Sequence, residues 1–241
     1  MAIGRACTPV TATDARLDEL AKRWALLPAQ VRALARLLEL LAADPHAPSS
    51  VRGVVAVDVH VADSLSALAL ECVRGARAVA DLGSGAGFPG LVLAVALPGA
   101  EVALVESAGR KCEFLERARV VVQAENVSVV RSRVESWDEG LVGQDLVTAR
   151  AVGPLALLCE YAAPLLVLGG TLVAWKGAVS EAELRAGTAA AAETGLEAAG
   201  TVRTEPYAGS VDRRLVMYAK VAETPARFPR RPGVARKRSR G

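Results

Sequence analysis

A glycine-rich segment flanked by acidic residues is the part of the sequence best suited to chemistry. Residues 81–90 read Asp-Leu-Gly-Ser-Gly-Ala-Gly-Phe-Pro-Gly, and Glu106 follows further along the chain. Glycines have no Cβ, so the backbone can turn tightly there and approach a ligand closely. An acid at the end of the next strand is spaced as in nucleotide-binding α/β folds, where it binds the cofactor ribose. The segment therefore predicts a site for a cofactor that contains a nucleoside.

Two cofactors compete for this site. Residues 85–90 match the GxGxxG pattern of dinucleotide-binding enzymes, which leaves an NAD-dependent oxidoreductase as a distant alternative. The glycines begin earlier, however, at Gly83, and Asp81 comes just before them. A carboxylate at this position would attract the ammonium group of S-adenosylmethionine and repel a pyrophosphate. We therefore predict S-adenosylmethionine, bound by Asp81, Gly83, Ser84, Gly85, Gly87, Phe88, Glu106 and Ser107.

The cysteines and histidines predict neither a metal centre nor a covalent nucleophile. The chain contains Cys7, Cys72, Cys112, Cys159, His46 and His60, with no CxxC pair and no spacing typical of metal ligands. Cysteine is among the most buried residue types, so we expect these four side chains to be small core residues. We expect no bound metal.

The charge of the chain is unevenly distributed. Its formal net charge is +3, but seven basic residues lie in the last fifteen positions, namely Arg227, Arg230, Arg231, Arg236, Lys237, Arg238 and Arg240. Without these seven residues the chain would carry 22 basic against 26 acidic side chains. A basic tail on an acidic body is typical of binding to a polyanion such as RNA. A solvated terminus that only aids solubility is the equal alternative.

The hydrophobic pattern predicts helices in the first part of the chain and alternating strands and helices in the rest. Thr11 with Asp14 predicts the capped start of a first helix, a second helix follows Pro28, residues 44–50 form a loop, and a third helix runs from near His60 to Cys72. The expected strands are 78–82, 101–106, 127–131, 146–150, 171–176, 200–204 and 214–221. The expected helices between them are 89–97, 109–124, 154–166 and 180–194.

This alternation predicts an α/β fold. We expect a Rossmann-like, mostly parallel seven-stranded sheet of the class I S-adenosylmethionine-dependent methyltransferase type, with helices on both faces. The last two expected strands have no long helix between them, which predicts an antiparallel terminal hairpin. The expected division is an N-terminal helical extension at 1–73, a cofactor-binding core at 74–222 and a basic C-terminal tail at 223–241.

Composition and segment lengths indicate a packed protein in the cytoplasm. The chain is 52% hydrophobic and 23% charged, which suits a globular fold and excludes intrinsic disorder. Residues 1–18 show no secretory signal, and apolar stretches such as 91–98 are far shorter than the roughly 20 residues of a membrane span. We therefore expect a cytoplasmic protein with no membrane partner, and a monomer.

At this point the sequence resembles the bacterial small-subunit ribosomal RNA guanine-N7 methyltransferase G family, also called glucose-inhibited division protein B. The matching stretches are 60–65, 83–90, 106–107, 110–111, 114–115, Asn126, 132–135, 148–151, 176–177 and 228–231. They cover most of the chain from about residue 58 to residue 231. The octapeptide Gly-Ser-Gly-Ala-Gly-Phe-Pro-Gly at 83–90 is the most family-specific of them.

The resemblance implies transfer of a methyl group to N7 of one guanine in 16S ribosomal RNA, free or in the small ribosomal subunit. It also implies that Val134 and Glu135 contact the cofactor adenine, and that His60, Asp63 and Ser64 form a helical feature near the cofactor entrance. An N-capped helix with a satisfied histidine is the alternative for those three residues. The family usually has Asn-Leu-Thr where this chain has Pro-Ser-Ser-Val at 48–51, so the role of that segment stays open.

Arg150 and Lys176 are the residues that we expect to act on the substrate. Both end expected strands at the carboxyl edge of the sheet, where open α/β folds bind ligands. We predict that they hold an RNA phosphate or the target guanine, with Arg150 also beside the cofactor. An ion pair with a carboxylate of the body, or a snorkelling surface side chain, is the alternative.

The absence of other catalytic motifs agrees with N7 as the methyl acceptor. Guanine N7 carries a lone pair and loses no proton, so no general base is needed, and the sequence shows no convincing nucleophile and base pair. Residues 148–151 read Thr-Ala-Arg-Ala, where methyltransferases of amino groups carry an Asn/Asp-Pro-Pro-aromatic motif. Methylation of another RNA position or of a small molecule, and cofactor-dependent RNA binding without catalysis, remain alternatives.

Overall fold

Seven strands form one sheet in the order β3-β2-β1-β4-β5-β7-β6 within residues 11–231, the part of the chain that the computed structural model describes. The strands are β1 (Ala78–Leu82), β2 (Glu101–Glu106), β3 (Val127–Arg131), β4 (Gln144–Arg150), β5 (Leu166–Lys176), β6 (Leu196–Arg203) and β7 (Arg214–Lys220). The first five pair in parallel, and β7 pairs antiparallel with both β5 and β6. The predicted sheet and its terminal hairpin are confirmed.

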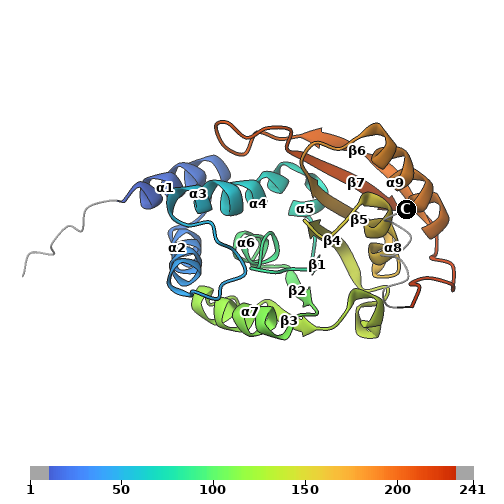
Figure 1. The fold of residues 1–241 in the computed structure, drawn as a ribbon, viewed down its shortest axis with the longest axis horizontal. Coiled ribbons are helices and arrows are strands. Elements are labelled where there is room, and N and C mark those ends of the chain that lie inside the picture. The colour runs from blue at the N-terminus through green and yellow to red at the C-terminus, as the bar shows by residue number, and fades with distance from the viewer. Residues whose placement is uncertain (1–10, 232–241) are drawn as a thin grey trace, which may run out of the picture.

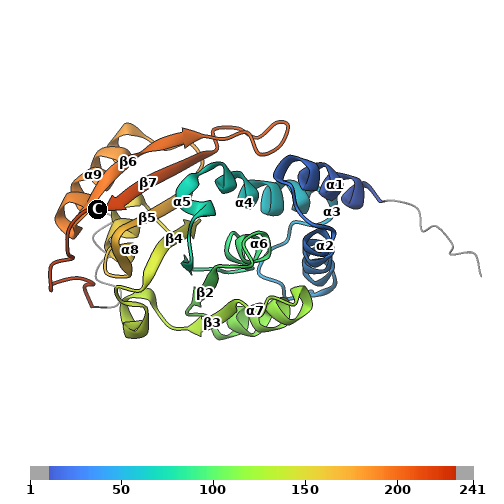
Figure 2. The same cartoon turned by 180° about the vertical axis from the view of Figure 1, so that it is seen from behind.

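Helices cover both faces of this sheet. They are α1 (Ala12–Trp24), α2 (Pro28–Ala43), α6 (Gly90–Ala96), α7 (Gly109–Val122), α8 (Leu155–Ala162) and α9 (Glu181–Thr194). Figure 1 shows the N-terminal helices and α6 on one side of the sheet and α8 with α9 on the other, and the view from behind in Figure 2 shows the same separation.

Alternating strand residues divide the core into two hydrophobic clusters. In β1, Val79 packs with the cluster that contains Leu34 and Leu93, whereas Ala80 packs with the cluster that contains Leu158. This follows from the strand geometry, in which successive side chains point to opposite faces. The N-terminal helices share their cluster with the sheet, so the described part of the predicted extension, from Leu17 to Val73, contributes to the same core as the cofactor-binding part.

The predicted elements differ from the structure mainly at two places. Helix α8 ends at Ala162 and β5 already begins at Leu166, whereas the sequence predicted a helix to residue 166 and a strand from residue 171. Pro164 explains the early end, because proline cannot donate the backbone hydrogen bond that would continue the helix. The strand then extends because Leu166 pairs with Gln144.

The predicted third helix begins earlier than expected and is irregular. It consists of α3 (Gly53–Ala56), a π-helical segment (Val57–Ala62), α4 (Asp63–Leu65), a 3-10 turn (Ser66–Ala69) and α5 (Glu71–Arg74). The start at Gly53 has no side-chain cap, so the N-cap considered for His60, Asp63 and Ser64 is wrong, whereas the histidine is satisfied as that alternative expected, by the Ser49 hydroxyl 2.8 Å away. The Ser64 hydroxyl instead donates to the carbonyl of His60, 2.6 Å away, inside the segment.

One end of the described part carries a local helix cap, and the other end is tied to the body. The capping box of Thr11 and Asp14 is present as predicted, and at the other end Arg230 pairs with the buried Glu160. Most of the basic tail, from Arg236 to Arg240, lies outside the described residues. No helix within residues 11–231 is long and apolar enough to cross a membrane.

Candidate active site

The glycine-rich loop connects the end of β1 to the start of α6. Gly83, Gly85 and Gly87 have φ angles of 64°, 58° and 90°, in the left-handed region that other residues adopt only at a cost. The amides of Gly83 and Ser84 donate to the carbonyl of Val105 at 2.8 and 3.3 Å, which ties the loop to the end of β2. The loop therefore curves over the carboxyl ends of β1 and β2, as the sequence predicted.

Asp81 is fully buried beneath this loop. One carboxylate oxygen accepts from the Thr148 hydroxyl at 2.8 Å and the other from the Gly90 amide at 3.2 Å, while the Ser84 hydroxyl donates to the Asp81 carbonyl at 2.7 Å. Burial raises the pKa of Asp81 to about 6 against the opposing effect of these hydrogen bonds. A contact of this carboxylate with a cofactor ammonium group stays a prediction.

The position of Asp81 also bears on the dinucleotide alternative. In dinucleotide-binding folds the pyrophosphate lies at the start of the helix that follows the glycines. Here the first amide of α6, that of Gly90, donates to the Asp81 carboxylate, and a Cβ on Gly90 would lie 2.8 Å from that carboxylate. A negative charge thus already occupies the helix start, which disfavours NAD.

Glu106 lies on the other side of the loop at the end of β2. The residue is 6% exposed, and its two side-chain oxygens accept from the Gly85 amide at 3.2 Å and the Ala108 amide at 2.9 Å. Lys111 is 3.8 Å from the same carboxylate, and Ser107 is exposed beside it. The two acids therefore bracket the glycine loop, in agreement with their predicted arrangement.

Val134 and Glu135 form a single 3-10 turn after β3. Since β3 is parallel to β2, this turn lies at the same edge of the sheet as Glu106. The Tyr161 hydroxyl donates to Glu135 at 3.1 Å. Trp137 follows in the chain and is only 8% exposed within the α8 cluster, so it is a core residue and not a platform for stacking bases.

Arg150 is held by the irregular N-terminal helix. Its guanidinium donates to the carbonyl of Val59 at 2.9 Å and to the Asp63 carboxylate at 3.0 Å, and it lies 5.6 Å from the centre of the Phe88 ring. Phe88 belongs to the glycine loop, so this arginine connects the cofactor loop to the end of β4. The predicted position of Arg150 at the carboxyl edge is therefore observed, and so is the ion pair with a body carboxylate that was its alternative, here with Asp63.

His60 also packs against Phe88, the ring that Arg150 approaches. Its ring stacks on Phe88 with centroids 4.4 Å apart, and its nitrogens lie 2.8 Å from the Ser49 hydroxyl and 3.3 Å from Arg150. Burial, and then the charges of Arg150 and Arg52, lower the pKa of His60 to about 4. The ring is therefore neutral at pH 7. The segment 48–51, whose role the sequence left open, positions this ring through Ser49.

Lys176 ends β5 beside Arg150. Its ammonium group lies 2.5 Å from Glu183 of α9 and donates to the carbonyl of Gly153 at 3.2 Å. Arg150 and Lys176 both line a cavity of about 200 Å³, together with Asp63, Ala151, Gly153, Leu158, Trp175, Gly177 and Arg213. The two predicted substrate residues thus meet in one pocket.

This pocket adjoins the cofactor loop. A Cβ on Gly83 would lie 2.8 Å from Val152, which belongs to the loop between β4 and α8. Ala151 has a φ angle of 59°, a strained conformation for a residue with a side chain and one that is typical of functional sites. Arg213 is a charged pocket residue that no sequence pattern marked, whereas Asp63 was indicated only by the family resemblance of residues 60–65.

The described cysteines do not supply a nucleophile. Burial raises the pKa of Cys159 to about 12, and it also raises the pKa values of Cys72 and Cys112, so all three favour the thiol over the reactive thiolate. Cys7 lies outside the described residues. Within residues 11–231, no group of three or more His, Cys, Asp or Glu side chains could hold a metal ion.

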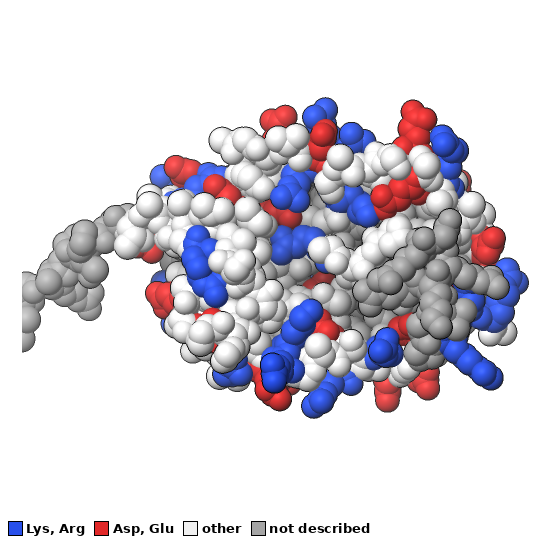
Figure 3. Space-filling model, viewed as in Figure 1, with Lys and Arg blue, Asp and Glu red and all other residues white. Residues whose placement is uncertain are grey.

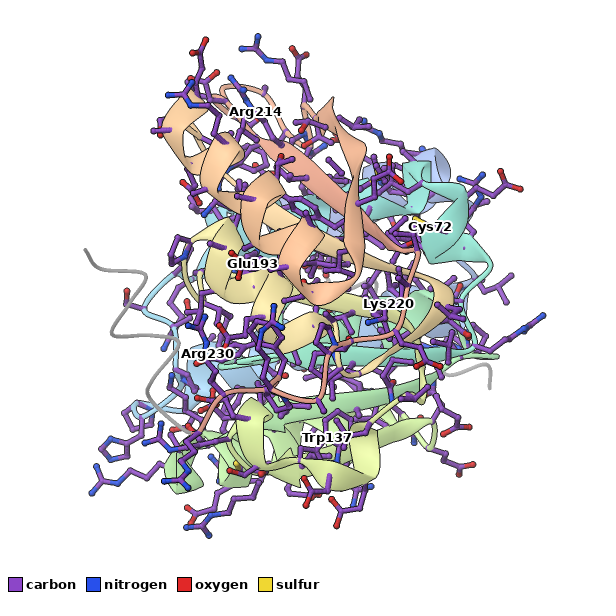
Figure 4. The ribbon with its side chains drawn as sticks, turned by 90° about the vertical axis from the view of Figure 1, so that its right-hand side faces the viewer. Cys72, Trp137, Glu193, Arg214, Lys220 and Arg230 are labelled. Atoms are coloured by element: carbon purple, nitrogen blue, oxygen red, sulfur yellow. The ribbon has the colours of Figure 1, made fainter. Side chains whose placement is uncertain are left out.

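A larger cavity, of about 340 Å³, lies at the opposite edge of the sheet. It is lined by Leu141 and Val142 before β4, by Leu168 near the start of β5, and by Lys220 at the end of β7. Figure 4 labels Lys220 in this region. The cavity is at the amino ends of the parallel strands, away from the glycine loop, Asp81 and Glu106. Open α/β folds bind their ligands at the carboxyl ends of the strands, so this cavity is not the candidate active site although it is larger than the pocket at Arg150.

Comparison with known proteins gives one family. The family model of rRNA small subunit methyltransferase G (GidB) matches residues 51–206. A Rubrobacter xylanophilus protein named ribosomal RNA small subunit methyltransferase G is 44% identical over 184 residues, covering 74% of this chain and 70% of the relative. A protein of the same name from Chloroflexus aggregans is 41% identical over 163 residues, covering 66% of this chain and 67% of the relative.

Solved structures support the fold. Aeropyrum pernix fibrillarin, solved with bound S-adenosyl-L-methionine, aligns with a TM-score of 0.51 at 20% identity, covering 66% of this chain and 73% of the other. A 16S rRNA adenine-N1 methyltransferase variant from Catenulisporales acidiphilia aligns with a TM-score of 0.52 at 16% identity, covering 64% and 89%. At these identities the likeness concerns the fold alone.

Proposed function

Because this chain belongs to the ribosomal RNA small subunit methyltransferase G family, we propose that it methylates N7 of a guanine in 16S ribosomal RNA. It is a class I methyltransferase, and its cofactor is S-adenosylmethionine. The observation that carries the proposal is the pair of buried carboxylates, Asp81 and Glu106, on either side of a left-handed glycine loop. This arrangement suits a ligand with ribose hydroxyls and a positive charge.

The residues of the loop fit the cofactor. The loop glycines leave the backbone bare where a nucleoside must approach closely, and Glu106 presents an acceptor for ribose hydroxyls. Val134 and Glu135 would contact the adenine ring. Phe88, which belongs to the glycine loop, would also contact the cofactor. When bound, S-adenosylmethionine supplies an electrophilic methyl group on a sulfonium centre.

The acceptor chemistry fits the residues that line the pocket. N7 of guanine has a free lone pair at neutral pH, so the protein has no proton to remove. The described pocket residues include cations and an aromatic ring but no pair of groups arranged as a nucleophile and its base. Arg150 and Lys176 would hold the RNA and align the base, which makes alignment and electrostatics the main contributions to the rate.

Basic side chains on the surface agree with an RNA partner. Figure 3 shows Lys and Arg side chains spread over the visible face, with Asp and Glu side chains exposed between them. Such cations bind phosphates and release counterions. We further propose that the protein works in the cytoplasm as a monomer, on 16S ribosomal RNA or on the small ribosomal subunit.

A methyl-transfer assay tests the function. The protein is incubated with S-adenosylmethionine carrying an isotope-labelled methyl group and with 16S ribosomal RNA or small subunits from cells that lack the protein. Mass spectrometry of the digested RNA should show labelled 7-methylguanosine. Label at another position, or in small molecules only, would support an alternative methyltransferase instead.

A matched pair of variants tests the site. Glu106→Gln should weaken cofactor binding by about tenfold or more, because a charge-assisted hydrogen bond contributes roughly 1.5–3 kcal/mol. Glu101→Gln makes the same change at the exposed start of the same strand and should bind normally. Calorimetry with S-adenosylmethionine measures both affinities, and equal affinities would remove Glu106 from the cofactor site.

A further inference from the structure

The pocket beside Arg150 contains a carboxylate with one oxygen left for a ligand. Asp63 is 2% exposed, and its Oδ2 accepts from Arg150 at 3.0 Å. Its Oδ1 accepts no hydrogen bond from the residues that the structure describes, and Arg213 Nε is its ion-pair partner at 3.9 Å. A buried carboxylate oxygen normally accepts hydrogen bonds, so this atom is available to a donor in the pocket.

The rest of the pocket suits a single flat base. Its volume of about 200 Å³ is of the order of one base and too small for a whole nucleotide. Trp175 and Leu158 line it with apolar surface, and Trp175 is fixed because its indole nitrogen donates to the Asp63 carbonyl at 2.9 Å. RNA-modifying enzymes commonly take a target base out of its stack into such a pocket.

The polar groups match guanine in particular. The Watson–Crick edge of guanine presents the N1–H and N2–H donors next to the O6 acceptor. Asp63 Oδ1 can accept from the two donors, and the neighbouring Arg213 can donate to O6. Adenine has an acceptor at N1, which would face the carboxylate. Recognition through this edge leaves N7 on the other edge of the base free to receive a methyl group.

We infer that Asp63, with Arg213 beside it, selects guanine by binding the Watson–Crick edge of the flipped target base. This inference rests on the proposed function and names the residues that give it base specificity. Asp63 makes this contact while its second oxygen keeps Arg150 at the glycine loop. The adjacency of Val152 to Gly83 places the pocket next to the cofactor loop.

An isosteric variant separates base recognition from the ion pair. In Asp63→Asn the amide oxygen should take the place of Oδ2, because Arg150 offers it a donor, and the amide NH₂ then faces the pocket. The pocket would present a donor where guanine needs an acceptor. Asp58→Asn is the matched control, since Asp58 lies on the same segment but pairs with Arg16 at 2.7 Å, away from the pocket.

The measurement is kcat/KM on RNA with guanosine or inosine at the target position. Inosine lacks only the N2 amino group and keeps N7. For the wild type, guanosine should be preferred by about 10- to 150-fold, the contribution of the one hydrogen bond to a charged group that inosine cannot make, since its N1–H still donates to Asp63. The preference should fall toward one in Asp63→Asn and stay unchanged in Asp58→Asn.

A second variant keeps the test decisive if Asp63→Asn does not fold. Arg213 is about one-third exposed and also donates to the Tyr207 hydroxyl at 3.2 Å, so Arg213→Gln should fold normally. It should lose preference for guanosine over 6-thioguanosine, in which sulfur, a weaker acceptor, replaces O6 while N1–H, the N2 amino group and N7 are kept.

The outcomes separate this inference from the function. If rates fall in Asp63→Asn or Arg213→Gln while the base preferences stay as in the wild type, the residues act only through folding or through Arg150, and the inference is wrong. If the wild type binds S-adenosylmethionine but methylates neither guanosine nor inosine RNA, the proposed function fails, and the inference fails with it.

Discussion

Arg150 joins segments that lie far apart in the chain. One guanidinium contacts Val59, His60 and Asp63 of the N-terminal segment and lies over Phe88 of the glycine loop. A charge with this many partners is fixed in one orientation, which an RNA-aligning residue requires. The neutral His60 ring completes the arrangement, since a protonated ring would lie directly beside the arginine.

The titration of His60 should make the free energy of unfolding depend on pH. Its pKa is near 4 in the folded protein and about 6.5 when unfolded, so the unfolded state binds more protons between these values and stability is lost as the pH falls through that window. Replacing His60 by Phe keeps an aromatic ring on Phe88 and removes the titration. Between pH 7 and pH 5, the wild type should lose about 1–2 kcal/mol more free energy of unfolding than His60→Phe.

Urea unfolding at several pH values measures this difference. Asp81, with its raised pKa, contributes the opposite trend, because its folded state binds the proton more tightly and its contribution to stability falls as the pH rises toward 6. That contribution is present in both proteins and cancels in the comparison. Parallel pH profiles for the two proteins would show that His60 is not neutral in the fold.

At the scale of elements, the loop between β1 and α6 is fixed by close packing. The first residue of α6, Gly90, fits because it has no side chain: a Cβ there would lie 2.4 Å from Leu104 and 2.8 Å from Asp81. The end of α6 is held by hydrogen bonds instead. The Asn126 amide, just before β3, donates to the carbonyls of Ala94 and Ala100 and thereby ties the start of β3 to the end of α6.

Gly90→Ala should therefore lower the free energy of unfolding by about 1–3 kcal/mol, the usual cost of overpacking a core. It should also weaken binding of S-adenosylmethionine, because the added methyl group pushes against the Asp81 carboxylate. Gly177→Ala is the control, since a Cβ at Gly177 meets no atom within 4 Å. Thermal denaturation of both variants measures the effect, and equal melting temperatures would show that the loop can adjust.

At the scale of the whole molecule, the C-terminal segment is anchored across α8. Arg230 binds Glu160 through two nitrogens, and Glu160 has a side chain only 4% exposed. In Figure 4, Arg230 lies between Glu193 of α9 and Trp137 of the segment before β4. Part of the basic tail predicted for RNA binding is therefore a structural ion pair.

Removing one partner of this pair should be costly. Arg230→Met would leave the buried Glu160 carboxylate without its cation, and we expect the free energy of unfolding to fall by about 2–4 kcal/mol. Arg231→Met removes the next, exposed arginine and should change stability by less than about 0.5 kcal/mol. Chemical denaturation distinguishes these cases. Similar stabilities would mean that Glu160 is solvated or protonated once Arg230 is gone.

The sequence by itself determined the order of the strands along the chain, the glycine loop and its two acids. These features depend on local patterns: the alternation of apolar residues, the positions where only glycine allows a turn, and the ends of neighbouring parallel strands. The same reasoning predicted that Arg150 and Lys176 would meet at the carboxyl edge. It also predicted the capped first helix, because Thr11 and Asp14 are three residues apart.

Only the tertiary structure decided which side chains pair across long stretches of sequence. Asp63 and Arg150 are 87 residues apart, and Arg213 comes from a different part of the chain again. The hydrophobic pattern predicted a helix from near His60 to Cys72, but its start at Gly53 and its irregular π and 3-10 turns are set by packing on α6 and by the contacts of His60 and Asp63. Ion pairs of this kind depend on how the elements pack, and that geometry is not contained in any short stretch of residues.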